Sequence, residues 1–322
     1  MRSYILRRFL HLIPILLGIS LLSFFVIQLA PGNFLTLMKA DPQVSKQKIA
    51  EMERKFGLDR PWPVQYGLWL KNIVLHFDFG YSFANKRPVG ALIRERLANT
   101  LLLSLTAMVL AWGLALPLGI ISAVRQYSWI DKLSSFFAFL GLSIPSVFFA
   151  LLMILFAAKT GWFPIGGMES LDYDSLGFWG KVGDRLHHLA LPALVLGTGP
   201  MAGHMRQMRG NLLDVLRMDY VTTARSKGLS ESKVILRHAV RNAINPLITI
   251  FGYSLASLLS GAFLVEVVMA WPGLGRLTVD ALFARDLYLV MGGVVMAATI
   301  LIISNLIADI MLALADPRIT YS

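Results

Sequence analysis

The chain has no cysteine and little charge. Of its 322 residues, 15% are Asp, Glu, Lys or Arg and 56% are hydrophobic, against about 25% charged and about 45–50% apolar in soluble proteins. The missing cysteines exclude disulfides, iron–sulfur clusters, thiolate zinc sites and cysteine nucleophiles. A soluble globular domain needs more charged surface than this chain offers. We therefore expect a protein whose solvent is largely lipid.

Acidic residues are the scarcer charged class. The chain has 19 Asp and Glu against 30 Lys and Arg, which gives a formal net charge of +11 and a pI near 10. A basic protein can bind nucleic acid, but in an apolar chain the excess is more typical of cytoplasmic loops that face anionic lipid headgroups. We therefore predict a membrane protein with no nucleic acid among its partners.

Six apolar stretches are long enough to cross a hydrocarbon core, which takes about 20 helical residues. The first follows a charged start, as a signal peptide does, but it is longer and lacks a clear small-x-small cleavage site, so we interpret it as a retained helix. The fourth is the weakest because histidines and prolines interrupt it, and the prolines in these spans predict kinks. The six stretches are residues 9–30, 97–123, 133–157, 187–204, 244–270 and 287–314.

Basic residues in the short connections predict the orientation, because they resist translocation. The N-terminus, the second connection and the fourth connection carry an excess of Lys and Arg, which the third and fifth lack. Both termini are therefore predicted in the cytoplasm. The expected organisation is an N-terminal helix at 1–30, an extracytoplasmic loop or cap at 31–96, a transmembrane core at 97–314 and a cytoplasmic tail at 315–322.

The outer loop carries two helical patterns. Residues 44–56 form a charged amphipathic pattern that Gly57 would end, and a second pattern contains Tyr66, Trp69 and Ile73. We predict a small folded cap. A cap that only covers the helix ends and a docking surface for a soluble partner are both open.

The fourth connection, at about 205–243, is the most informative segment. It holds eight basic and three acidic residues, and its two helical patterns are broken at Gly228, with Ser230 placed as the cap of the second helix. The small residues before the turn offer a surface on which another protein could lie closely. A solvated or lipid-associated basic hairpin is the alternative. The predicted contact residues are Thr222, Thr223, Ala224, Lys227, Gly228 and Leu229.

Recognisable catalytic motifs are missing from the sequence. Its one Gly-Lys pair, Gly180 and Lys181, lacks both the first glycine and the Ser or Thr of a phosphate-binding loop, and the six histidines form no H-E-x-x-H motif. We therefore predict no catalytic residue, no metal site and no cofactor bound by this chain.

Two acidic residues lie inside predicted spans, where ionised groups are costly. Glu266 is near the outer end of the fifth span and Asp309 near the inner end of the sixth. Each could snorkel or pair at an interface, and the alternative is a role in a gate or pathway.

The segment at 219–246, DYVTTARSKGLSESKVILRHAVRNAINP, resembles the ATPase-docking loop of ABC-type importer permeases of the dipeptide, oligopeptide and nickel branch. The usual core is Glu-Ala-Ala, three residues and a glycine. Here Thr222, Thr223 and Ala224 precede Gly228 at that spacing. The chain lacks the glutamate, and its proline lies later than in the general family. Both departures are ordinary in the peptide branch.

Further motifs extend the resemblance over nearly the whole chain. They are LRRFLHLIPILLGISLLSFFVIQLAPG at 6–32, FGLDRPWPVQY at 56–66, GLSIPSVFF at 141–149, AWPGLGR at 270–276 and ADPRITY at 315–321. Together they resemble the first permease subunit of dipeptide and oligopeptide importers. The resemblance implies an all-α integral membrane protein with six transmembrane helices in the type I ABC importer architecture.

The same resemblance implies the partners. The chain would pair with a second homologous permease in a bacterial inner membrane, receive substrate from an extracytoplasmic peptide-binding protein and dock two ABC ATPases on the cytoplasmic hairpin. ATP and Mg²⁺ would be bound by the ATPases. The contact residues named above would form a coupling helix that carries ATPase closure to the spans.

Three questions stay open at this stage. Related permeases carry dipeptides, oligopeptides, glutathione, nickel chelates or antimicrobial peptides, and peptide is our choice. A proton-coupled secondary carrier should show acidic or histidine residues in mid-span and related halves, and the sequence lacks the first and gives no evidence of the second. A membrane-embedded enzyme would need a catalytic cluster, and none is apparent.

Overall fold

The computed structural model describes residues 2–29, 45, 47, 51, 53, 54, 57 and 59–315, with side chains described only between 12 and 310. The predicted amphipathic pattern at 44–56 and the predicted tail at 315–322 fall mostly outside these residues. The chain forms two compact units. The first contains residues up to 100 and 272–303, and the second contains 101–271 and residues from 304 on.

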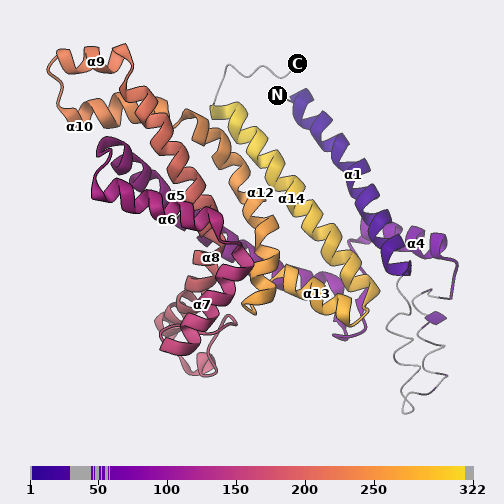
Figure 1. Ribbon diagram of the computed structural model, residues 1–322. Coiled ribbons are helices and arrows are strands. Elements are labelled where there is room, and N and C mark those ends of the chain that lie inside the picture. Colours follow the sequence, from indigo (N-terminus) through magenta and orange to yellow (C-terminus); the bar gives the residue numbers. More distant parts are fainter. Residues whose placement is uncertain are drawn as a thin grey trace. The chain divides into compact units, whose positions relative to one another are not determined.

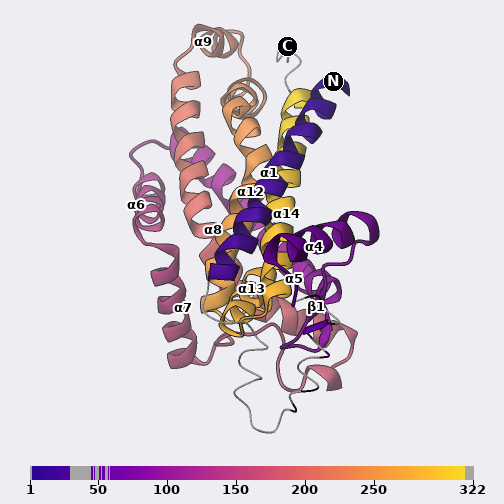
Figure 2. The same ribbon diagram turned by 90° about the vertical axis from the view of Figure 1, so that its right-hand side faces the viewer.

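Helices build the first unit, together with one short hairpin of strands. Trp69 of α4 packs against Phe24 of α1 and against Leu287 and Met291 at the start of α14, and Figure 2 shows α4 crossing α1. The second helical pattern of the outer loop is therefore confirmed. The elements are α1 (Arg2–Leu29), α4 (Trp62–His76), β1 (Tyr81–Ser82), β2 (Arg87–Pro88), the first turns of α5 (Val89–Val124), α13 (Leu274–Phe283) and α14 (Leu287–Ala315) up to residue 303.

The strand hairpin is fixed to α14 by a buried carboxylate. β1 and β2 pair antiparallel, with Ser82 opposite Arg87. The Asp286 carboxylate, 0% exposed, accepts hydrogen bonds from the Ser82 hydroxyl at 2.7 Å and from the Ala84 amide at 3.0 Å. Because a buried charge needs such partners, Asp286 holds the turn after β1 against the helix start.

The second unit contains the rest of α5 and most of the long helices. Its largest apolar cluster joins α5, α7, α8 and α12 and includes Leu103, Leu196 and Trp271. The elements are α6 (Trp129–Ser143), α7 (Ser146–Thr160), η1 (Tyr173–Ser175), α8 (Phe178–Leu216), α9 (Asp219–Ser226), α10 (Glu231–Lys233), the π-helix η2 (Val234–Ala239), α11 (Val240–Ala243) and α12 (Asn245–Val268).

The third predicted span, 133–157, is not one continuous helix. α6 and α7 are bent by 109° at the break between Ser143 and Ser146, and Figure 1 shows the two helices running in different directions. Pro145 has no backbone N–H and disfavours helical geometry at the residue before it, which explains the break at Ile144. The proline therefore produces a sharper change of direction than a kink.

Four described helices are long and apolar enough to cross a membrane, or five if the bent pair counts as one span. The fourth predicted span, 187–204, lies inside α8, a helix of 39 residues that is not among the four. Six crossings therefore remain a prediction. The four helical segments are Leu12–Leu29, Val89–Val124, Asn245–Val268 and Leu287–Ile310.

Candidate functional site

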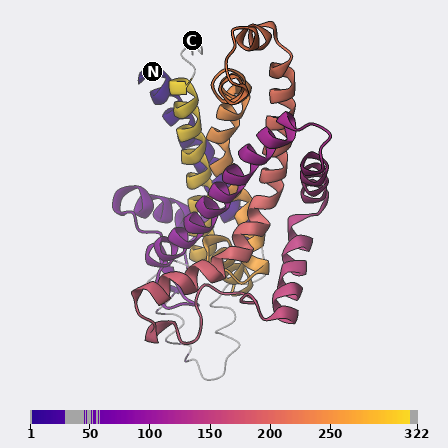
Figure 3. The same ribbon diagram turned by 90° about the vertical axis from the view of Figure 1, so that its left-hand side faces the viewer.

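The basic segment at about 205–243 forms a helical hairpin at the end of α8. α8 continues to Leu216, so the first part of this predicted connection is still helix. After α8 come α9, a turn at Gly228, and the run α10, η2 and α11 that returns toward α12. Figure 1 and Figure 3 show α9 and the returning helices beyond the end of α8. The predicted order of helix, turn and helix is confirmed.

An apolar inner face attaches this hairpin to the second unit. Val221 and Ala224 lie three residues apart on α9, so they share one face, and both are buried. They belong to a cluster that also contains Met208 and Leu212 of α8 and Val234 of η2. Burial of these side chains holds a helix that is otherwise too short and too polar to be stable alone.

The turn of the hairpin depends on a left-handed backbone at Gly228. Its φ is +74°, a conformation that glycine adopts at little cost. A Cβ added there would meet no atom within 4 Å, so the backbone conformation, not lack of space, favours glycine. The Arg225 guanidinium spans the turn to the Glu231 carboxylate at 2.7 Å and holds the pKa of Glu231 below its usual range.

The six predicted contact residues fall into two groups. Thr222, Thr223, Lys227 and Gly228 are exposed and form the outer face of α9 and its turn. Ala224 is only 6% exposed, and Leu229 is half-buried and packs on the hairpin's apolar cluster. Ala224 therefore does not lie on the exposed surface that the sequence predicted for it. Ala224 and Leu229 attach the outer face instead of forming it.

Polar side chains make the hairpin a rigid body. The Asn242 amide of α11 donates to the Tyr220 hydroxyl of α9 at 2.7 Å, and the Asn211 amide of α8 donates to the Ala243 carbonyl at 3.1 Å. These bonds connect the two arms to each other and to α8. A force applied to α9 is thereby passed to α8 and α11. The exposed cations on this body are Arg206, Arg217, Arg225, Lys227, Lys233, Arg237 and Arg241.

A charged clamp between α6 and α8 was not predicted from the sequence. The Arg209 guanidinium donates to both oxygens of the Asp131 carboxylate, at 2.7 Å from Nε and 2.8 Å from Nη2. Asp131 is 3% exposed and also accepts from the Tyr127 amide at 2.9 Å. Such a bidentate buried pair is geometrically specific. The one signal in the sequence was a single acid in a basic connection.

The two acidic residues inside predicted spans are both buried. Glu266 of α12 is 0% exposed and Asp309 of α14 is 3% exposed. The Tyr253 hydroxyl of α12 donates to the Asp309 carboxylate at 2.7 Å. Asp309 is therefore paired inside the packed helices, and neither side chain snorkels to solvent. A gate role for either residue stays a prediction.

An apolar cavity of about 540 Å³ lies among α6, α7, α8 and α12 of the second unit. Its polar groups are few, mainly the hydroxyls of Ser146, Thr198 and Ser257. No group of three or more His, Asp or Glu side chains is placed to hold a metal ion in the described part of the chain. The cavity suits apolar or uncharged matter, and its walls offer no charge to a ligand.

Two family models match the chain. The one described as "Binding-protein-dependent transport system inner membrane component" covers residues 115–321, and its N-terminal companion, "Binding-prot-dependent transport system membrane comp, N-term", covers residues 1–106. The first alone covers more than half of the sequence. The hairpin lies entirely within it.

Curated relatives match over the full length of the chain. The oligopeptide transport system permease protein AppB of Bacillus subtilis is 47% identical over 100% of both chains. The dipeptide transport system permease protein DppB is 37% identical in Alkalihalophilus pseudofirmus, over 100% of both chains, and 37% in Escherichia coli K12, over 100% of this chain and 99% of the relative.

Proposed function

Because the chain belongs to the binding-protein-dependent transport system inner membrane component family, we propose that it is one of two permease subunits of an ATP-driven importer of dipeptides and oligopeptides. The full-length identity of 47% with an oligopeptide permease is the observation that carries this proposal. The chain is a multi-pass membrane protein whose apolar helices supply the spans.

The proposed transporter assembles three kinds of protein partner around the lipid-embedded chain. A second homologous permease completes the passage, two ABC ATPases bind the hairpin in the cytoplasm, and an extracytoplasmic binding protein delivers the peptide. ATP and Mg²⁺ belong to the ATPases, and this chain contributes no catalytic group. The excess of Lys and Arg in the N-terminus and in the second and fourth connections supports cytoplasmic termini and an outer loop at 31–96.

The outer face of α9 is the proposed contact with an ATPase. Thr222 and Thr223 are small and exposed, and the Thr223 hydroxyl donates back to the Asp219 carbonyl at 2.9 Å. The side chains of this surface are short and the Thr223 hydroxyl already has a partner, so a groove can close over it. Lys227 and Gly228 extend this surface, while Ala224 and Leu229 hold it from below.

The contacts of α9 with the rest of the second unit provide a route for force from the ATPase. ATPase closure would move α9 together with α8 through the buried cluster of Val221, Ala224 and Leu212. The Asp131–Arg209 clamp would then pass the motion of α8 to α6. Such coupling requires contacts that differ between the inward-open and outward-open states.

Transport of labelled trialanine tests this function. Cells or proteoliposomes with the complete transporter should accumulate the peptide, lose uptake when this chain is omitted, and lose it with ATPase inhibition by vanadate. Uptake of a nickel chelate or glutathione without any peptide would contradict the peptide cargo. Uptake abolished by a protonophore in vesicles with a constant ATP supply, and insensitive to vanadate, would indicate a proton-coupled carrier instead.

A further inference from the structure

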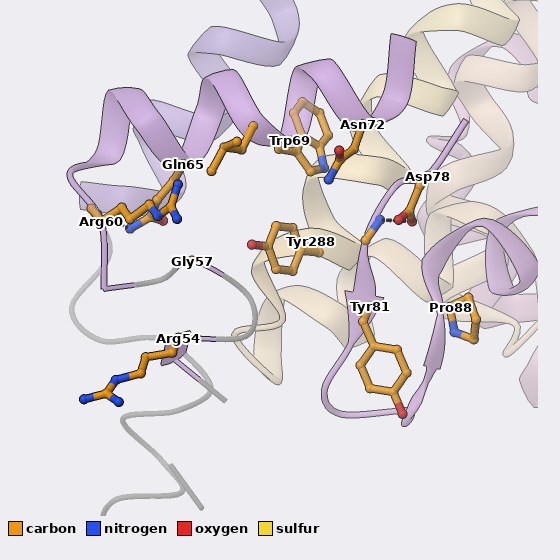
Figure 4. Close-up of a pocket in the computed structure, with 12 residues that line it drawn as sticks. Arg54, Gly57, Arg60, Gln65, Trp69, Asn72, Asp78, Tyr81, Pro88 and Tyr288 are labelled. Carbon is orange, nitrogen blue, oxygen red and sulfur yellow. Dashed lines mark hydrogen bonds between the residues drawn. The ribbon is translucent and has the colours of Figure 1, made fainter. Parts of the chain in front are cut away.

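The first unit contains a cavity of about 770 Å³, lined by both polar and apolar residues, that the proposed function does not use. Its volume is within the range of about 300–1,000 Å³ typical of sites for small ligands. One wall is a face of α4, and the others come from the segment around β1 and from the start of α14, as Figure 4 shows. The residues that line it are Arg54, Gly57, Arg60, Gln65, Leu68, Trp69, Asn72, Asp78, Gly80, Tyr81, Pro88 and Tyr288.

The walls of this cavity are built by close packing. Trp69 is 4% exposed, and its indole N–H donates to the Phe79 carbonyl at 3.2 Å. Gly80 has a φ of +95°, and a Cβ there would approach the Tyr288 ring to 3.0 Å. Only glycine therefore allows the backbone to pass this close to Tyr288. The close approach of the main chain at Gly80 therefore fixes the position of the Tyr288 ring in the cavity wall.

Charges of opposite sign lie at different ends of the cavity. Figure 4 shows Arg60 and Arg54 on the opposite side of the cavity from Asp78, with the Tyr288 side chain between them, and the Arg54 guanidinium points away from Tyr288. One Asp78 oxygen accepts from the Gly80 amide at 2.9 Å, which orients the carboxylate. No ion pair joins Asp78 to either arginine within the described part of the chain. The two ends therefore do not neutralise each other.

Amide-bearing groups lie between these ends. Gln65, Asn72, Leu68 and Trp69 share one face of α4, as their spacing of three and four residues requires. The Gln65 amide donates to the Arg60 carbonyl at 2.7 Å, which ties the arginine's backbone to the helix. Carboxamides can both donate to and accept from a peptide bond. Because Gln65 also accepts from the Gln28 amide at 3.3 Å, its carboxamide is already engaged, and Asn72 is the carboxamide that the cavity offers to a peptide bond.

We propose that this cavity is a binding site for a short peptide with free termini, with the carboxylate at Arg60, the Arg54 side chain turning inward to meet it, and the ammonium group at Asp78. A zwitterionic ligand satisfies both charged ends at once, which an anion or a cation alone does not. The inference rests on the proposed function, since it names a place in this chain where the imported peptide binds. At such a site this chain would recognise the peptide independently of the binding protein.

A photo-crosslinking competition tests the site directly. The full-length chain in lipid nanodiscs is incubated with a tripeptide whose central residue is p-benzoylphenylalanine, irradiated and mapped by mass spectrometry. Cross-links are expected in residues 62–81. Hexaalanine, which is long enough to reach from one end of α4 to the other, should compete, and its N-acetyl and C-terminal amide forms should each compete about tenfold less well, as expected for the loss of one charge-assisted contact.

Substitutions assign each end of the peptide to its residues. The double variant R54Q/R60Q should lose the preference for the free carboxylate and keep that for the free amine, and Asp78→Asn should do the reverse. K71Q/K86Q removes two exposed cations of the same unit outside the cavity, and Asp174→Asn removes an exposed acid elsewhere. Both controls should bind as the unaltered chain does, and thermal unfolding of each variant checks that it is folded.

Three results would overturn the site. They are cross-links outside the cavity, equal competition by the capped peptides, and the same loss of preference in K71Q/K86Q as in R54Q/R60Q. If peptides do not bind the cavity and R54Q/R60Q weakens docking of the binding protein, the cavity is a contact surface for that protein. Failure here with normal trialanine uptake by the whole transporter refutes only this site. Failure of uptake itself refutes the proposed function.

Discussion

The hairpin of α8 to α11 and the outer segment of α4 to β2 both connect apolar helices, yet they present opposite kinds of surface. The hairpin buries its apolar side chains and exposes small residues and cations on an outer face, whereas the outer segment encloses a cavity with charge at both ends. An exposed face of small residues suits a partner that closes around it. A cavity with fixed charges suits a small ligand that enters it.

Under the proposed function, the two regions separate energy input from ligand recognition within one membrane chain. Residues that attach the hairpin, such as Val221, are apolar and interchangeable in chemistry, so their role is mechanical. Residues that line the outer cavity, such as Arg60 and Asp78, carry specific chemistry and little packing. Substitutions in the first region should therefore change coupling, and substitutions in the second should change ligand preference.

The largest effect is expected from Val221→Asp. It places a carboxylate in the apolar cluster below α9, at a position that is 0% exposed, so the hairpin should detach. Uptake of trialanine should fall to background, while cross-linking of the tripeptide to the outer cavity stays normal. Val221→Ala, which keeps an apolar side chain, should retain most of the uptake. Loss of both activities in Val221→Asp would show that the two regions do not separate.

The next largest effect concerns the clamp of Asp131 and Arg209. Arg209→Met leaves the buried Asp131 carboxylate without its cation and should cost about 3 kcal/mol of stability, whereas Asp131→Leu leaves a guanidinium whose side chain is 24% exposed and should cost less. The double variant with both apolar residues should recover most of this loss. Thermal unfolding in detergent measures all three. If the single variants are as stable as the unaltered chain, the pair of Asp131 and Arg209 does not stabilise the protein.

A smaller effect is expected at the hairpin turn. Gly228→Val places a β-branched residue at a φ of +74°, at a cost of about 1–2 kcal/mol, whereas asparagine tolerates this conformation. Uptake should fall several-fold in Gly228→Val and little in Gly228→Asn. Hydrogen exchange of the α9 amides should rise in the same order. Equal behaviour of the two variants would mean that the backbone geometry of the turn is unimportant.

Much of the fold followed from local patterns in the sequence. The hairpin's order of helix, turn and helix was predictable because Gly228 interrupts two helical patterns, and α4 was predictable from its apolar periodicity. The break at Ile144 was only partly predicted. Pro145 predicted a kink in this span. Whether a proline kinks or ends a helix depends on what packs around it, because α8 continues unbroken across Pro192 and Pro200.

The parts that escaped prediction depend on residues far apart in the chain. Asp131 and Arg209 are 78 positions apart, and no local pattern in one sequence pairs them. The side of α9 that faces the core was also undecided, because in so short a helix the burial of Ala224 is set by α8 and η2. The outer cavity likewise joins α4 to Tyr288, which lies in a distant helix.

Cysteine cross-linking tests the central claim, that the outer face of α9 contacts an ATPase, most directly. The chain has no cysteine of its own, so a single introduced thiol reports one position. Thr223→Cys lies on the exposed face, and Ala224→Cys lies beside it in the buried cluster. The account predicts that a short bifunctional reagent joins Thr223→Cys to the ATPase subunit and leaves Ala224→Cys unjoined. No cross-link from Thr223→Cys in a transporter that still hydrolyses ATP and takes up peptide would contradict it.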